Sequence, residues 1–92
     1  MNKITLYGKP NCHLCDLALE VIDAVRQRYT FALAIRNILE DIDDFQRYKH
    51  DIPVILLNGI ELARHRLTEE QLATALARQQ PASYKDGDGA NP

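Results

Sequence analysis

Residues 4–15 read ITLYGKPNCHLC and combine a strand, a turn and the beginning of a helix. Residues 3–8 alternate apolar with other side chains, which is typical of a strand, and residues 8–11 supply turn-forming types. From Cys12 the apolar spacing changes to three and four, the period of a helix, which is predicted to continue to about Arg28. The apolar stripe of this helix is predicted to consist of Leu14, Leu17, Ala18, Val21, Ile22 and Val25.

The remaining chain predicts five further elements. They are a buried, mostly apolar strand over 30–38, a short helix capped by Asp41, strands over 54–57 and 60–64 joined by Asn58-Gly59, and a helix opened by Thr68 and Gln71. The Asn-Gly pair is a strong hairpin signal, and Thr68 with Gln71 has the form of a capping box. On the short helix, Ile42, Phe45 and Tyr48 fall at helical spacing. The order β-α-β-α-β-β-α predicts an α/β protein with a four-stranded mixed sheet flanked by three helices. A right-handed crossover through the first helix is expected to join the first two strands, which are then parallel.

Length and composition limit the function. The 92 residues make one domain, predicted over 1–80, and the polar, Gly/Pro-rich residues 81–92 are predicted to form a disordered tail after Pro81 ends the last helix. Eleven Lys and Arg against thirteen Asp and Glu give a net charge of −2, which argues against nucleic-acid binding. No apolar run suits a signal peptide or a membrane span. We therefore expect a cytoplasmic monomer with neither nucleic-acid nor membrane partners.

Cys12 and Cys15 carry the clearest chemical signal. Three residues apart on a helix, they share a face, so their sulfurs can close a short disulfide ring. The first helical turn offers unpaired N–H groups and the positive end of the helix dipole, and both stabilise a thiolate at Cys12. Cys15 is expected to be more buried and less reactive. The pattern predicts that Cys12 attacks a substrate disulfide and that Cys15 resolves the mixed disulfide.

Other interpretations of the cysteine pair stay open. The two residues could be half-buried core cysteines, or could bind a metal. Zinc normally takes four ligands. Apart from the two cysteines, the candidate ligands are His13, His50 and His65, with no second cysteine pair, so no metal site is predicted. Covalent haem is excluded because Asp16, not histidine, follows Cys15. An iron–sulfur cluster shared between two chains remains an alternative.

The strand, the Cys-x-x-Cys helix start and the later Ile52-Pro53 dipeptide together resemble the glutaredoxin branch of the thioredoxin superfamily. The resemblance covers about residues 2–80 and implies a thioredoxin fold. It also implies that Pro53 is a cis proline facing the cysteines and that the backbone of Ile52 pairs with substrate as an added strand. Lys9 matches a lysine that contacts a glutathione carboxylate in glutaredoxins. Within the branch, Cys-His-Leu-Cys is most similar to small glutaredoxin-like proteins.

Two departures from that family bear on glutathione. Asp51 stands where a threonine is usual, and residues 60–66 replace the Gly-Gly segment that holds the γ-glutamyl end. These differences put glutathione recognition in question and leave the dithiol chemistry untouched. His13, when protonated, would lower the pKa of Cys12.

The sequence as a whole predicts a glutaredoxin-like thiol–disulfide oxidoreductase. Its partner is expected to be a disulfide-containing protein or glutathione, with glutathione as a possible co-substrate and no tightly bound cofactor. Thioredoxin reductase is an alternative source of electrons. The rival function is a non-catalytic binding module of the same fold.

Overall fold

The computed structural model describes residues 1–79. Its elements follow the predicted order and are β1 (Lys3–Gly8), α1 (His13–Val25), β2 (Ala32–Asn37), the 3-10 turn η1 (Ile38–Glu40), α2 (Ile42–Tyr48), β3 (Val54–Leu57), β4 (Ile60–Arg64) and α3 (Glu69–Gln79). The predicted tail over 81–92, and the helix end predicted at Pro81, lie outside the described residues. Among residues 1–79, no helix has the length and apolar character needed to cross a membrane.

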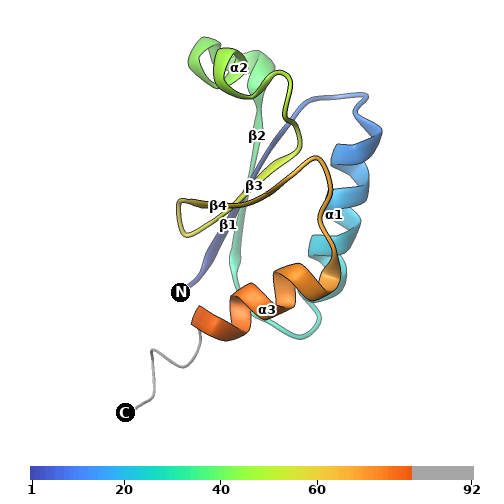
Figure 1. The fold of residues 1–92 in the computed structure, drawn as a ribbon, viewed down its shortest axis with the longest axis vertical. Coiled ribbons are helices and arrows are strands. Elements are labelled where there is room, and N and C mark those ends of the chain that lie inside the picture. The colour runs from blue at the N-terminus through green and yellow to red at the C-terminus, as the bar shows by residue number, and fades with distance from the viewer. Residues whose placement is uncertain (80–92) are drawn as a thin grey trace.

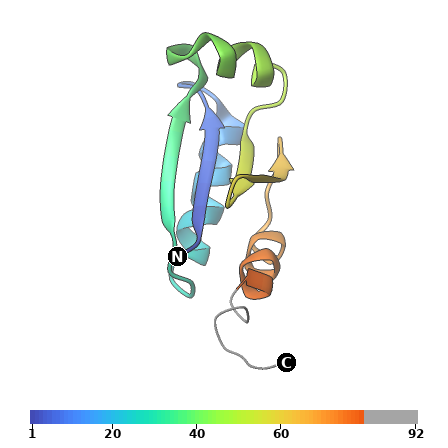
Figure 2. The same ribbon diagram turned by 90° about the vertical axis from the view of Figure 1, so that its left-hand side faces the viewer.

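The four strands form one mixed sheet in the order β2-β1-β3-β4. β1 is parallel to β2 and antiparallel to β3, and β4 returns antiparallel to β3 (Figure 1). Because β1 lies between β2 and β3, the loop that follows β1 leaves the sheet at a central position and not at an edge. Figure 2 shows α2 lying beyond the ends of β1 and β2, with α1 behind these two strands. The cysteine-bearing helix start therefore lies at the carboxyl end of a central strand.

Two apolar clusters cover the two faces of the sheet. The larger cluster packs α1 and α3 against one face and includes Ile4, Leu6, Ile22, Ile55, Leu72 and Leu76, all at most 1% exposed. The smaller cluster lies on the other face near the end of the sheet, where Tyr48 of α2 meets Val54 and Tyr7. Burial of this apolar surface is the main stabilising contribution to the fold.

The helix caps and the hairpin turn lie at the residues that the sequence predicts. The Asp41 side chain accepts from the N–H of Asp44 at 3.0 Å and caps α2. The capping box of α3 is complete, since the Thr68 hydroxyl accepts from the Gln71 N–H at 3.0 Å and the Gln71 side chain accepts from the Thr68 N–H at 3.4 Å. Asn58 and Gly59 take the positive φ values of 54° and 85° that the tight hairpin turn requires.

Two predictions about burial are wrong. β2, predicted as a buried strand, is an edge strand on which Ile35 is 59% exposed, because β3 pairs with β1 on the opposite side. The buried stripe of α1 is rotated from the predicted one: its members are Cys15, Ala18, Ile22 and Val25. Leu14 and Val21 are only half-buried, and Leu17 is exposed.

Candidate redox site

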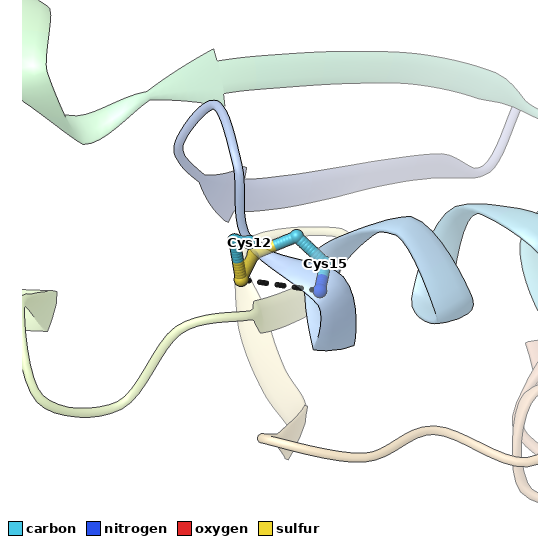
Figure 3. Close-up of a disulfide and its surroundings, with 2 residues drawn as sticks. All are labelled: Cys12 and Cys15. Carbon is cyan, nitrogen blue, oxygen red and sulfur yellow. Dashed lines mark hydrogen bonds between the residues drawn. A yellow bond between two sulfur atoms is a disulfide. The ribbon is translucent and has the colours of Figure 1, made fainter.

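The two cysteines occupy the N-terminus of α1. Cys12 is the N-cap residue, with φ −110° and ψ 105°, and its Sγ accepts a hydrogen bond from the Cys15 N–H at 3.2 Å. Cys12 and Cys15 are joined by a disulfide, with their Cα atoms 5.2 Å apart (Figure 3). A backbone N–H that points at Cys12 Sγ stabilises negative charge on that sulfur once the disulfide is opened.

The two sulfurs differ in accessibility, as the sequence predicts. Cys15 is 4% exposed and belongs to the buried stripe of α1, whereas Cys12 is half-buried at the end of the helix. A reagent arriving from solvent therefore reaches Cys12 first. Cys15 is shielded from solvent and within disulfide reach of Cys12.

Gly8, the last residue of β1, packs directly against Cys15. A Cβ atom at position 8 would lie 2.9 Å from Cys15 Sγ and 3.3 Å from Cys15 Cβ. Both distances are shorter than ordinary van der Waals contact, so the absence of a side chain at this position makes room for the sulfur. The sequence pattern indicates Gly8 only as a turn residue and gives no sign of this contact.

We expect Gly8→Ala to make the protein a stronger oxidant. The added methyl group presses on Cys15 Sγ where the disulfide holds it, and the freed thiol can turn away into an adjoining cavity of about 280 Å³ that both residues line. Overpacking of this kind costs about 1 kcal/mol, which corresponds to a midpoint potential roughly 20 mV less negative. The potential is measured in glutathione buffers, with Gly59→Ala as the control: its positive φ of 85° makes alanine there destabilise the oxidised and reduced forms alike, while nothing lies within 4 Å of the added Cβ. Equal destabilisation of the oxidised and reduced forms by Gly8→Ala, with an unchanged potential, would contradict the expectation.

The Ile52–Pro53 peptide bond is cis, as the resemblance implies. Tyr7 pairs with Val54 across β1 and β3, so Pro53 lies level with Gly8, the residue that contacts Cys15. Pro53 is buried and Ile52 is half-buried. Within residues 1–79, neither the N–H nor the C=O of Ile52 has a hydrogen-bond partner. The backbone that the resemblance assigns to substrate is thus unpaired and lies near the disulfide.

Lys9 and His13 lie on either side of Cys12 in the chain, and both are exposed. Lys9 lines the cavity of about 280 Å³ already described, together with Arg36 of β2 and Cys15. That cavity opens on the β2 side of α1, whereas Ile52 leads into β3 on the other side. The structure therefore places Lys9 and Ile52 on opposite flanks of the cysteine pair, and His13 on the first turn of α1.

Asp51 forms an ion pair with an arginine of β4. Arg64 Nη1 lies 3.1 Å from Asp51 Oδ2, and the same guanidinium donates two hydrogen bonds of 2.7 Å to Glu61. These bonds lower the pKa of Glu61 below its usual value and raise the pKa of Arg64. The anion expected to disfavour an anionic substrate is thus partly neutralised.

His65, the residue after β4, contacts the segment 50–53 that leads into β3. Its N–H donates to the Pro53 C=O at 2.7 Å, and its ring nitrogen Nε2 lies 3.2 Å from the His50 carbonyl oxygen and 3.8 Å from Asp51. His65 has a φ of 70°, which is uncommon for a residue with a side chain. Across residues 1–79, no group of three or more His, Cys, Asp or Glu side chains is arranged to hold a metal ion.

A profile of the family described as Glutaredoxin-like domain (DUF836) matches residues 3–77. The chain belongs to this glutaredoxin-like family. Glutaredoxin-like protein YDR286C homolog from Dictyostelium discoideum is 32% identical over 77 residues, and the match covers 75% of this chain and 69% of that protein.

Solved structures share the fold of this chain. Protein XcR50 from X. campestris is 29% identical, with a TM-score of 0.64 over 82% of this chain and 96% of the other. Protein Ne2328 from Nitrosomonas europaea is 23% identical with a TM-score of 0.72 over 82% and 91% of the two chains. Thioredoxin 1 from Thermosipho africanus is 17% identical with a TM-score of 0.65 over 90% and 99%. The last two similarities concern the fold alone, and together they confirm the predicted thioredoxin fold of this glutaredoxin-like protein.

Proposed function

We propose that this glutaredoxin-like protein is a thiol–disulfide oxidoreductase that uses Cys12 and Cys15 to reduce disulfides. The observation that carries the proposal is the asymmetry of the pair. Cys12 Sγ is the more accessible sulfur and accepts a backbone hydrogen bond at a helix N-terminus, whereas Cys15 is 4% exposed and within disulfide reach. A nucleophile and a resolving thiol need these two environments.

The proposed reaction has two exchange steps. The Cys12 thiolate attacks one sulfur of the substrate disulfide, which breaks the substrate S–S bond and releases the other sulfur as a thiolate. Cys15 then loses its proton and attacks Cys12 Sγ, forming the Cys12–Cys15 disulfide and releasing the second substrate thiolate. Two electrons pass from the protein to the substrate through these sulfurs alone, so the reaction requires no resident cofactor.

The substrate is proposed to bind as an extended strand beside Ile52. Its backbone would accept from the Ile52 N–H and donate to the Ile52 C=O, both of which lack partners within residues 1–79. Pro53, buried and level with Gly8, would hold this segment against the disulfide. The partner is a disulfide-containing protein or glutathione.

Glutathione is proposed as the reductant that restores the dithiol. Two glutathione molecules would supply the two electrons and leave as glutathione disulfide, with the exposed Lys9 ammonium near a glutathione carboxylate. A protonated His13 would favour the Cys12 thiolate. Because such thiol pools are reducing in the cytoplasm, we propose that compartment.

We expect Arg64→Ala to weaken the use of glutathione disulfide. The change removes the cation 3.1 Å from Asp51 and leaves that carboxylate uncompensated beside Ile52. The second-order rate constant for oxidation of the reduced protein by anionic glutathione disulfide, followed by intact mass in a single turnover, should fall by about threefold to fivefold, while that for uncharged hydroxyethyl disulfide changes little. Arg28→Ala, an exposed arginine in the turn after α1, removes the same charge elsewhere and is the control. An equal effect of both variants, or an equal effect of Arg64→Ala on both substrates, would refute a role for the Arg64–Asp51 pair.

The proposal is tested by the pH dependence of Cys12 alkylation in the reduced protein. The rate constant for iodoacetamide, followed by intact mass, should report a Cys12 pKa in the range of about 3.5 to 7.5, below the ordinary value of about 8.5. A Cys12 pKa at or above the ordinary value, together with slow alkylation, would instead favour a non-catalytic binding module.

A further inference from the structure

A groove of about 400 Å³ lies between α1 and the segment that joins β4 to α3. Its α1 wall includes Leu14, Leu17 and Val21, and its opposite wall includes His65, Leu67 and Thr68. We call it the α1 groove. Its volume is in the range of sites that hold small molecules or single side chains.

The apolar surface of the α1 groove lies beside the core: Val21 packs partly against the core and Leu67 belongs to it, whereas Leu14 and Leu17 are not part of that cluster. The core-facing stripe of α1 is formed by Cys15, Ala18, Ile22 and Val25. Leu14, Leu17 and Val21 lie beside that stripe, and Leu17 is 36% exposed. The helix thus carries a wider apolar surface than its own core requires, and this additional surface faces the groove.

Both walls of the α1 groove are attached to groups of the redox site. Leu14 directly precedes Cys15 on the first turn of α1. On the other wall, the His65 N–H donates to the Pro53 C=O at 2.7 Å. One end of the groove therefore lies next to the residues where the substrate disulfide is proposed to react.

The rim of the groove carries charges of both signs, so it does not select for a net charge. Arg66 stands on the wall of the β4–α3 segment, and Glu20 and Glu69 also line the groove. The selective element is the apolar interior. An apolar side chain that neighbours the substrate cysteine fits this interior, and glutathione offers no such side chain.

We propose that the α1 groove binds an apolar side chain of a protein substrate, next to the cysteine whose disulfide is reduced. This inference rests on the proposed function and names its substrate class as protein disulfides in an apolar sequence context. Leu17 is then a specificity-determining residue, because it contributes exposed apolar area to the wall.

The test uses two short peptides that differ only beside the cysteine. One peptide has leucine on both sides of its cysteine and the other has serine, and each is joined by a disulfide to 5-thio-2-nitrobenzoate. The Cys12 thiolate attacks the peptide sulfur and the chromophore leaves as a thiolate. Cys15 then closes the protein disulfide and releases the peptide thiol. The absorbance of the released chromophore gives the second-order rate constant for the full-length reduced protein.

The leucine peptide should react about fivefold to tenfold faster than the serine peptide, because part of its side chain leaves water in the groove. Leu17→Glu should bring the ratio of the two rate constants close to one, and Leu17→Ala should lower it. Leu39→Glu, which changes a leucine that is 58% exposed outside the groove, should keep the wild-type ratio. Circular dichroism checks that each variant is folded. If Leu17→Glu does not fold, Leu17→Ala provides the test.

The outcomes separate this inference from the proposed function. Equal rates with the two peptides in the wild type, or an unchanged ratio in the folded Leu17 variants, would overturn the groove assignment and leave the reductase activity standing. Failure of the wild type to release the chromophore from either peptide would overturn both.

Discussion

The Cys12→Ser variant is expected to lose disulfide reduction by at least about a thousandfold, because a serine hydroxyl does not form the anion that attacks sulfur at neutral pH. Cys15, at 4% exposure, cannot substitute for Cys12 with a substrate in solution. The fold should tolerate the change. Cys12 is the N-cap of α1, and a serine oxygen accepts the Cys15 N–H at this position as well as the sulfur does.

Activity is measured as turnover of hydroxyethyl disulfide with glutathione as reductant. The thermal midpoint of Cys12→Ser is compared with that of the reduced wild type, since neither contains a disulfide. Turnover near the wild-type rate by a folded Cys12→Ser protein would show that another group is the nucleophile, and the mechanism would have to be abandoned.

The Cys15→Ser variant is expected to stop at the mixed disulfide. Cys12 keeps its accessible position and attacks the substrate, but no second thiol can displace the bound group. Incubation with glutathione disulfide should convert nearly all of the variant to a form heavier by one glutathionyl group, whereas the wild type releases glutathione and closes its own disulfide. Intact mass spectrometry distinguishes the two products.

The control for this experiment is the double variant Cys12→Ser, Cys15→Ser, which should gain no mass. If Cys15→Ser remained unmodified, Cys12 would not be the attacking thiol. Multiple rapid turnovers without an accumulated adduct would mean that external thiols resolve the intermediate, and Cys15 would then have no resolving role.

Local signals predicted most of the fold. Asp41 and the Thr68–Gln71 pair bond to backbone groups within three residues, and Asn58-Gly59 forms its turn through its own φ values, so these features depend little on the rest of the chain. The Cys-x-x-Cys spacing likewise placed the pair correctly at the beginning of α1. Local hydrogen bonding, which sequence patterns describe well, therefore accounts for the position of the cysteines.

Features that depend on tertiary packing were not predicted. The apolar composition of residues 30–38 indicated a buried strand, but strand order placed β2 at the sheet edge. A turn at Asn58-Gly59 would pair Val54 with Ala63 in a regular hairpin. An irregularity between Ile55 and Leu56 instead pairs Val54 with Arg64, the residue that reaches Asp51. Strand order and a bulge are set by packing across the whole sheet, so single-sequence patterns do not report them.

The central claim, that Cys12 and Cys15 form a reversible redox couple, is tested most directly by equilibrating the full-length protein in graded mixtures of reduced and oxidised glutathione. After acid quenching, intact mass gives the fraction of protein that has lost two hydrogen atoms. A reversible Cys12–Cys15 couple should give one reversible transition with a midpoint between about −180 and −270 mV, the range of thiol–disulfide enzymes. Two thiols that stay reduced across the whole series, or a disulfide that stays closed across it, would contradict the account.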